Sequence, residues 1–529
     1  MPSRRQFLRQ AALSGAACLL PGVALAMPSG RHSIVRVRSG RIAGTLEHGV
    51  HVFRGIPYGA DTAPRRFRTA LREVPWRGVR DAQAYGAAAP QRGSEGPGSE
   101  DCLFLNVWTP ALGDGGKRPV LVYIHGGGYN TGSGSDPLYD GTRLCRRGDV
   151  VVVTLNHRLN AFGYLHLADI AGPGYRDAGN AGQLDLIQAL QWVREHAAAF
   201  GGDPGNVTVF GQSGGGAKIA TLMAMPAASG LFHRAWTMSG QQVTAAGPRA
   251  ADGRARIYLE ALGLQPGDID GLRTLPVDVL LQAQSVRDPS RVEDMALYFG
   301  PVMDGTHLPR HPFWPDAPPQ SARIPMVIGN TRDETRAFLG NDPINFTLDW
   351  DALPDRLRKY QFVDIDPQVV VTEYRRLYPD YTPSEVFFAA TTAGRSWRGA
   401  VEELEVRARQ GNNTWAYQLD WHPDDEEGRR MRAFHTLDIP LVFDNIAQPG
   451  SRTGTAADAQ RVADAMSYAL LAFARHGDPG AGTVGGWPPY TRDRRETLVF
   501  DTLPRIEEDP RGGERRLYQR VPFIQRGTV

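Results

Sequence analysis

The stretch TVFGQSGGGAKIA, from Thr208 to Ala220, is the feature that most limits what this chain can fold into. It joins a β-rich apolar run directly to a segment of helical character, and it places one hydroxyl among glycines at the junction. A sharp strand-to-helix turn strains the backbone at its tip, so the neighbouring residues must lack bulky side chains. Gly211-Gln212-Ser213-Gly214-Gly215 fits the pattern G-x-S-x-G, which in this context indicates a nucleophilic serine.

Short β-rich runs recur on both sides of this turn, and helical periodicity lies between them. The middle runs are continuously apolar, as strands buried on both faces require. In the segment 181–200, Leu184, Ile187, Leu190 and Val193 form one helical stripe. Strands that alternate with helices predict an α/β fold with a large, mostly parallel sheet covered on both faces. The runs are RPVLVYIH (118–125), DVVVVTLNH (149–157), NVTVFG (206–211), RAWTMSG (234–240), IPMVIGN (324–330) and NTWAYQLDW (413–421).

A second glycine cluster, HGGG at 125–128, directly follows the run that ends at Ile124. A serine that attacks an acyl carbon needs donors aimed at the oxyanion that forms, and glycines let backbone N–H groups approach a substrate closely. The alternative is an ordinary glycine turn. Two such clusters, each at the carboxyl end of a buried strand, favour the functional interpretation, because open α/β sheets bind ligands at that edge.

Six stretches together resemble the type-B carboxylesterases of the α/β-hydrolase superfamily, the family that includes the cholinesterases. They occur in family order over almost the whole chain after the N-terminus. They are VFRGIPYG (52–59), SEDCLFLNVWTP (99–110), YIHGGGY (123–129), FGGDPGNVTVFGQSGGG (200–216), GNTRDET (329–335) and AFHTLDIPLVF (433–443).

The resemblance implies a complete set of site residues for ester hydrolysis. It implies Ser213 as the nucleophile, Glu334 as the acid and His435 as the general base. It also implies an oxyanion hole formed by the backbone N–H groups of Gly127, Gly128 and Gly214. The order serine, acid, histidine along the chain agrees with this fold. The chemistry needs neither a metal nor a cofactor, so we expect none.

Other residues compete for two of these roles. Asp333 is adjacent to Glu334, which the family match favours as the acid. His422 lies in the charged segment WHPDDEEGRR, which is typical of a solvated loop. His476 precedes Gly477, which is typical of a helix end followed by its cap. His435 is the remaining candidate for the base, with a buried structural histidine as the alternative.

Three departures from the resemblance bear on the substrate. Gln212 stands where many animal relatives have glutamate, which removes a negative charge beside the serine. Residues 90–101 contain no tryptophan, the residue with which cholinesterases bind a quaternary ammonium group. A choline ester is therefore not expected as the substrate. Lys218 follows the serine by one helical turn; we expect it to reach the surface, with the placing of an anionic substrate as the alternative.

The N-terminus has the three parts of an export signal. Basic residues Arg4, Arg5 and Arg9 precede an apolar run, and a small-x-small cleavage site ends at Ala26. The segment SRRQFL resembles the twin-arginine signal of bacteria. We therefore expect residues 1–26 to be removed and residues 27–529 to form one domain, periplasmic or secreted. A membrane anchor is disfavoured because the run is short and contains Pro21.

Two cysteines, Cys102 and Cys145, follow the expected cleavage site. The related disulfide of the cholinesterases would need a partner upstream of Cys102, and that part of the chain after cleavage has none. We expect both to be free, buried thiols. A protein exported after folding would acquire its core in a reducing compartment, which agrees with this expectation.

Charge and composition exclude some functions and leave three hypotheses. The chain has 59 basic against 57 acidic residues, and loss of residues 1–26 leaves 56 against 57. A net basic face for nucleic acid or anionic membrane is therefore not indicated. The favoured function is a carboxylesterase acting on a small-molecule ester. A hydrolase narrowly specific for a plant, toxin or polymer ester, and a non-catalytic binding protein, are the alternatives.

Overall fold

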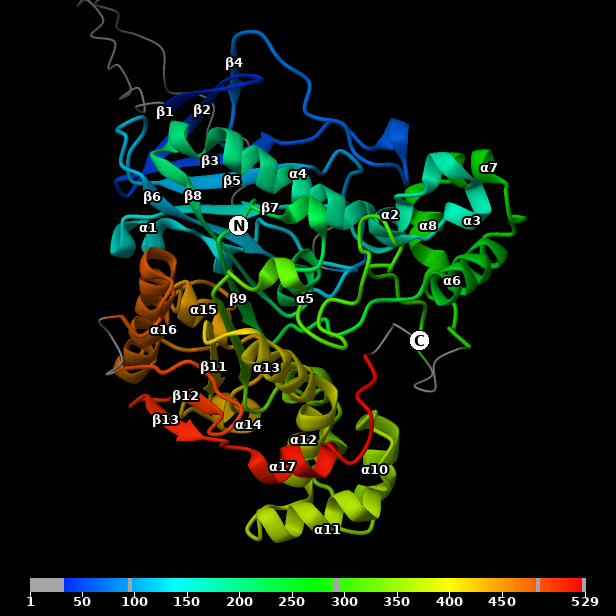
Figure 1. Ribbon diagram of the computed structural model, residues 1–529, viewed down its shortest axis with the longest axis vertical. Coiled ribbons are helices and arrows are strands. Elements are labelled where there is room, and N and C mark those ends of the chain that lie inside the picture. Colours follow the sequence, from blue (N-terminus) through cyan, green and yellow to red (C-terminus); the bar gives the residue numbers. More distant parts are fainter. Residues whose placement is uncertain (1–32, 94–97, 290–294, 482–485, 526–529) are drawn as a thin grey trace, which may run out of the picture.

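A single sheet runs through the molecule (Figure 1). The computed structural model describes residues 33–529 except 94–97, 290–294, 482–485 and 526–529. The expected export signal, residues 1–26, lies outside the described part. Within that part the sheet has 13 strands in the order β1-β2-β3-β5-β7-β6-β8-β9-β10-β11-β12-β13, and β4 pairs with β2.

The strands have the following bounds: β1 (Ser33–Val37), β2 (Gly40–Glu47), β3 (Val50–Pro57), β4 (Val79–Asp81), β5 (Phe104–Thr109), β6 (Arg118–Ile124), β7 (Val151–Leu155), β8 (Gly202–Gln212), β9 (Arg234–Met238), β10 (Met326–Thr331), β11 (Thr414–Leu419), β12 (Glu496–Phe500) and β13 (Arg505–Glu508).

The centre of this sheet is parallel, as the sequence predicts. Strands β7, β6, β8, β9, β10, β11 and β12 pair in parallel with their neighbours. The flanking pairs β1/β2, β2/β3, β3/β5, β5/β7 and β12/β13 are antiparallel. All six β-rich runs identified in the sequence are strands, and β8 begins earlier than expected, at Gly202.

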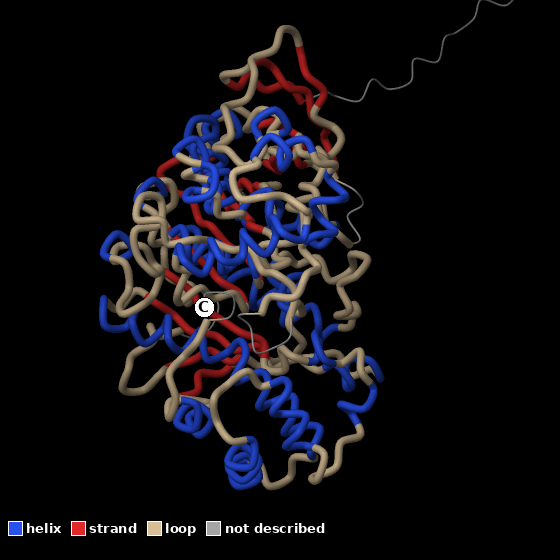
Figure 2. The backbone as a smooth tube through the Cα atoms, turned by 90° about the vertical axis from the view of Figure 1, so that its right-hand side faces the viewer, coloured by secondary structure: helices blue, strands red, loops and turns tan. Residues whose placement is uncertain are grey.

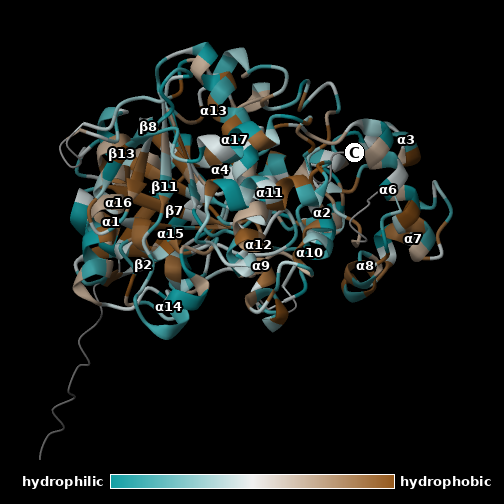
Figure 3. Cartoon of the chain, turned by 90° about the horizontal axis from the view of Figure 1, so that it is seen from below, coloured by the Kyte–Doolittle hydropathy of each residue, from teal (hydrophilic) through white to brown (hydrophobic). Residues whose placement is uncertain are grey.

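Alternate residues of the central strands enter two different cores. On β6, Val122 and Ile124 pack in a cluster with helices on one face of the sheet. Leu121 and Tyr123 pack with other helices on the opposite face. Figure 2 shows the strands between helices, and Figure 3 shows apolar residues on the central strands and on parts of the helices around them. Burial on both faces explains why these strands are continuously apolar.

The helices form layers on the two faces and two groups outside them. The first face carries α4 (Ala181–His196), α5 (Gly214–Leu222) and α13 (Arg398–Gln410), and the second carries α1 (Thr142–Gly148), α15 (Asp438–Val442) and α16 (Ala457–His476). One outer group contains α2 (Asn160–Tyr164), α3 (Ala168–Ala171), α6 (Pro248–Ala261), α7 (Ile269–Thr274) and α8 (Val277–Ala283). The other contains α9 (Arg336–Leu339), α10 (Leu353–Tyr360), α11 (Pro367–Leu377), α12 (Pro383–Thr392) and α17 (Gly512–Tyr518). The short helix α14 (Glu426–Met431) precedes α15 in the chain.

Backbones meet without intervening side chains where β6, β8 and β9 end. A Cβ atom at Gly215 would lie 1.9 Å from the carbonyl oxygen of Ile124. A Cβ atom at Gly240 would lie 1.9 Å from the carbonyl oxygen of Ser213. These glycines are therefore steric requirements of the junction, and they bring the start of α5 against the end of β6.

We expect Gly215→Ala to lower the free energy of unfolding by about 3 kcal/mol, because the added methyl overlaps the Ile124 carbonyl in rigid backbone. Chemical denaturation followed by circular dichroism measures this change.

Gly253→Ala is the matched control. Gly253 lies in α6, and a Cβ atom there would meet no neighbour within 4 Å. Alanine should leave stability unchanged or raise it by up to about 1 kcal/mol through helix propensity. Equal effects of the two substitutions would contradict the steric account of the junction.

Candidate active site

Ser213 lies at the tip of the turn between β8 and α5 in strained backbone geometry. Its dihedral angles are φ 56° and ψ −126°, outside the regions that residues with side chains normally adopt. The N–H of Ser213 donates a hydrogen bond of 2.7 Å to the carbonyl of Met238 at the end of β9. The neighbouring strand therefore holds the strained residue in place, with its side chain at the wall of a cavity.

His435 and Glu334 meet beside the same cavity. Nδ1 of His435 contacts Oε2 of Glu334 in a hydrogen bond. The other carboxylate oxygen of Glu334 accepts hydrogen bonds from the N–H of Thr331, at 3.0 Å, and from Nδ2 of Asn330, at 3.1 Å. Glu334 and His435 are both buried. Nε2 of His435 is buried and has no hydrogen-bond partner among the described residues.

Asp333, the competing acid, points elsewhere. Its carboxylate lies 3.4 Å from Nε of Arg336, one turn along the chain. The contact with His435 is therefore made by Glu334, as the family resemblance implies. His476 ends α16 and Gly477 caps it with φ 74°, as predicted.

Gln212 has a structural function that the sequence did not reveal. Its side chain is buried, and Nε2 donates a hydrogen bond of 2.5 Å to the carbonyl of His435. This hydrogen bond links the segment that carries His435 to Gln212, the residue before Ser213. An amide can donate a hydrogen bond and a carboxylate cannot. Gln212 therefore differs from the glutamate of many animal relatives in hydrogen bonding as well as in charge.

The glycine loop after β6 lies against the start of α5. Gly127 and Gly128 have φ angles of 82° and 63°, in the left-handed region that favours glycine. A Cβ atom at Gly214 would lie 2.1 Å from the carbonyl oxygen of Gly128. The backbones of all three predicted oxyanion-hole residues are thus brought together beside Ser213.

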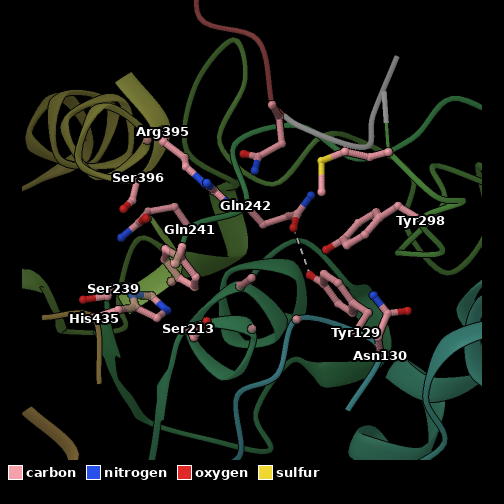
Figure 4. A pocket seen from close by; sticks show the side chains of 18 of the residues that line it. Tyr129, Asn130, Ser213, Ser239, Gln241, Gln242, Tyr298, Arg395, Ser396 and His435 are labelled. Atoms are coloured by element: carbon pink, nitrogen blue, oxygen red, sulfur yellow. Dashed lines mark hydrogen bonds between the residues drawn. The ribbon is translucent and has the colours of Figure 1, made fainter. Parts of the chain in front are cut away.

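The cavity in front of these residues has a volume of about 410 Å³ (Figure 4). Tyr129 lies in its wall, and its hydroxyl donates a hydrogen bond of 2.9 Å to Oε1 of Gln242. The ring of Phe338 lies 4.7 Å from the ring of His435. Several lining residues were not identified from the sequence: Tyr129, Asn130, Gln241, Gln242, Phe338, Gly399, Phe523 and Gln525. Tyr129 ends the stretch YIHGGGY, whereas most of the others come from distant segments and have no local signal in the sequence.

Two segments from the outer helical groups also contribute to the cavity. The segment 247–299 supplies Met295 and Tyr298, and the segment 341–397 supplies Arg395 and Ser396. In Figure 4 the latter two lie on the side of His435, and Tyr298 lies on the side of Tyr129. The cavity is therefore lined by both polar and aromatic side chains.

Lys218 does not reach the surface, so that expectation was wrong. Every residue of α5 is buried, and the Lys218 side chain is fully enclosed. Its Nζ donates a hydrogen bond of 3.0 Å to the carbonyl of His125. A lysine reaches solvent only where its helix has an exposed side, and α5 has neighbours on every side.

Two further carboxyl groups are buried near the site. Burial raises the pKa of Asp438 to about 7, with a further contribution from the charge of Glu334. The Asp438 carboxylate accepts a 2.9 Å hydrogen bond from the Tyr417 hydroxyl. Burial likewise raises the pKa of Glu403 to about 8, and Glu403 accepts a 2.8 Å hydrogen bond from the N–H of Gln242.

Cys102 and Cys145 are free and buried, as expected, and burial raises the pKa of both thiols. The described residues contain no group of three His, Cys, Asp or Glu side chains arranged to hold a metal ion. Among the described helices, none combines the length and the apolar character needed to cross a bilayer.

Comparisons with known proteins agree with this geometry. The model of the carboxylesterase family matches residues 31–516. Para-nitrobenzyl esterase from Bacillus subtilis is 37% identical over 497 residues, which covers 92% of this chain and 98% of the relative. Phenmedipham hydrolase from Pseudarthrobacter oxydans is 35% identical over 488 residues, which covers 88% and 94%.

The same agreement extends to solved structures. The structure of a carboxylesterase from Geobacillus stearothermophilus matches with a TM-score of 0.81 at 39% identity, covering 92% of this chain and all of that one. The parallel sheet and its helical layers define an α/β-hydrolase fold. The chain belongs to the carboxylesterase family, and it is an enzyme that hydrolyses carboxylic esters.

The pH dependence of stability should report the buried Asp438. Its folded-state pKa of about 7 lies above the ordinary value of 3.8, so the folded protein retains a proton that the unfolded chain loses. Stability therefore falls as pH rises from about 4 to about 7, by roughly 4 kcal/mol in total from this group. We expect the stability of Asp438→Asn relative to the wild type to rise across this window.

Thermal unfolding midpoints at several pH values measure the difference. Asp424→Asn serves as the control, because Asp424 is exposed and its difference from the wild type should stay nearly constant with pH. A constant difference for Asp438→Asn as well would show that Asp438 does not titrate in this way.

Proposed function

We propose that Ser213 is the nucleophile, His435 the general base and Glu334 the orienting acid of this carboxylesterase. The observation that carries the proposal is that Ser213 and His435 line one cavity while Glu334 contacts the far side of the imidazole. Because the Glu334 carboxylate accepts hydrogen bonds, Nδ1 of His435 carries the proton and Nε2 is left as the base.

The reaction proceeds in two acyl-transfer steps. His435 takes the proton of Ser213 as the serine oxygen attacks the ester carbonyl, and the protonated imidazole then gives a proton to the leaving alcohol. Water repeats the sequence on the acyl-enzyme and releases the acid. The N–H groups of Gly127, Gly128 and Gly214 stabilise the oxyanion in both steps, and each such donor contributes about 2.7 to 4 kcal/mol in a comparable site.

The proposal does not require a hydrogen bond between Nε2 of His435 and Ser213 in the free enzyme. Catalytic hydrogen bonds are often long without substrate and shorten in the substrate complex. Glu334 holds the imidazole from one side, and Gln212 holds the backbone of His435 from another. These contacts support an imidazole that is oriented before substrate binds.

The cavity supports small or medium esters as substrates. Its volume of about 410 Å³ falls in the range typical of small-molecule sites. Three relatives of this chain are named as a para-nitrobenzyl esterase, a phenmedipham hydrolase and a fumonisin B1 esterase, so proteins similar to it act on different substrates. We therefore propose a carboxylesterase without a narrow requirement for one ester.

The first test is hydrolysis of p-nitrophenyl esters from acetate to long acyl chains. The wild type should be active with a preference for short or medium chains, and Ser213→Ala should lose activity by about 10⁶-fold, as in comparable serine enzymes. Release of p-nitrophenolate measures both. Full activity in Ser213→Ala would refute the assignment of the nucleophile.

The adjacent carboxylates supply a matched control for the acid. Glu334→Gln should lower kcat strongly because the imidazole loses its charged partner, whereas Asp333→Asn should leave kcat nearly unchanged. The opposite result would assign the role to Asp333.

We also propose that residues 1–26 direct export by a twin-arginine pathway. The paired arginines, the apolar run and the small-residue cleavage site support this proposal. Two free buried cysteines are compatible with folding in a reducing compartment before export. The mature enzyme would then act in the periplasm or outside the cell.

Replacement of both Arg4 and Arg5 by lysine should keep the enzyme in the cytoplasm of a bacterial host with an active twin-arginine system. Esterase activity in periplasmic and cytoplasmic fractions measures the distribution, and mass spectrometry of the exported protein should find an N-terminus at Met27. An unchanged distribution would count against this signal.

A further inference from the structure

Lys218 connects the two parts of the oxyanion hole. Gly127 and Gly128 belong to the loop after β6, whereas Gly214 begins α5. Lys218 lies on α5 four residues after Gly214, so both residues are on the same side of the helix. Its Nζ donates a hydrogen bond of 3.0 Å to the carbonyl of His125, the residue that opens the glycine loop.

The glycine loop is held through three consecutive carbonyl groups. The carbonyl of His125 accepts from Lys218, and the carbonyl of Gly126 lies 3.0 Å from Nδ1 of the His125 ring. The carbonyl of Gly127 accepts from the N–H groups of Asn130 and Thr131, at 3.2 and 3.1 Å. A peptide unit is planar, so the fixed carbonyls of Gly126 and Gly127 also fix the N–H groups of Gly127 and Gly128, whereas the carbonyl of His125 fixes the place where the loop begins.

These three contacts differ in origin. The His125 ring and the two N–H groups belong to the loop itself, and they set its internal shape. The contact from Lys218 comes from the helix that follows the nucleophile. The hydrogen bond from Lys218 therefore sets the position of the loop relative to Gly214. Gly127 and Gly128 have no side chains and cannot make such a contact themselves.

Lys218 forms no ion pair with any of the residues that the structure describes. The side chain is fully buried, and burial lowers the pKa of Lys218 to about 7. The titratable groups that face it are two imidazoles and a phenol. The rings of His125 and His157 stack at 5.0 Å, burial lowers the pKa of each, and the Tyr129 ring lies 5.9 Å from Nζ.

We propose that Lys218 is a positioning residue for catalysis, which fastens the glycine loop to α5 and so aligns the N–H groups of Gly127 and Gly128 with that of Gly214. A lysine buried without an acidic partner is costly, and an apolar residue would fill the same space. The hydrogen bond to His125 accounts for its presence. The proposal rests on the proposed function, because it concerns the oxyanion formed after attack by Ser213.

The test is Lys218→Met in the full chain, which puts an unbranched apolar side chain, one atom shorter than lysine, in the same space and removes the donor. Loosening of the hole weakens binding of the oxyanion and leaves binding of the neutral ester intact. We therefore expect kcat for p-nitrophenyl butyrate to fall by about tenfold or more, with KM within about twofold. An alkyl trifluoromethyl ketone, which forms a tetrahedral oxyanion on the serine, should bind more weakly by a similar factor.

Ile219→Val is the matched control on the same helix. Ile219 is fully buried in the core cluster between α5 and the sheet, and its side chain makes no polar contact. Its shortening should leave both kcat and the affinity for the ketone near the wild-type values. Equal losses in the two variants would show a general effect of disturbing α5 and would overturn the proposal.

Lys218→Gln provides a second variant, with a donor that is one bond shorter. It should lie between the wild type and Lys218→Met in kcat and in ketone affinity. If Lys218→Met does not fold, a Lys218→Gln variant with the wild-type unfolding midpoint must still show reduced kcat with unchanged KM. Wild-type kcat and ketone affinity in a folded variant would overturn the proposal.

The outcome is separable from that of the proposed function. If Ser213→Ala is inactive and Lys218→Met has wild-type kinetics, this inference alone fails. If Ser213→Ala retains activity, the proposed nucleophile is wrong and this inference falls with it.

Discussion

The strained backbone at Ser213 is the constraint on which the rest of the structure depends. A residue with φ 56° and ψ −126° remains there only if its surroundings hold it. The surroundings are backbone atoms: β9 binds the N–H of Ser213, and Gly215 and Gly240 allow β6, β8, β9 and α5 to meet with no side chain between them. The parallel register of these strands brings their ends together and thereby exposes the serine to the cavity.

Buried polar contacts then complete the site around that turn. Gln212 connects the serine turn to the backbone of His435, which lies 223 residues further along the chain. Glu334 receives hydrogen bonds from Asn330 and Thr331 before it contacts His435. Each of these groups is buried, so each unmade hydrogen bond would be costly. Lys218 makes a similar buried contact at the glycine loop. Its Nζ donates a hydrogen bond to the carbonyl of His125, which satisfies that carbonyl and holds the loop against α5.

Sequence reasoning succeeded where the signal was local. Continuous apolar runs predicted β6 to β11, since strands buried on both faces need apolar side chains on both. The turn at Ser213 and the contact of Glu334 with His435 also agree with the expectations. Lys218 was the error: a lysine near the start of a helix has the same local signal whether its helix is exposed or enclosed. The antiparallel pairing of β1 to β5 likewise depends on partners distant in sequence.

The sequence by itself determined the alternation of strands and helices, the glycines that permit the serine turn and the residue types that perform the chemistry. These follow from periodicity and from steric demands within a few residues. The tertiary structure alone decided what holds the histidine backbone, where Lys218 points and which distant side chains line the cavity. Such contacts depend on the packing of segments hundreds of residues apart, and local sequence does not encode the direction in which a side chain points after packing.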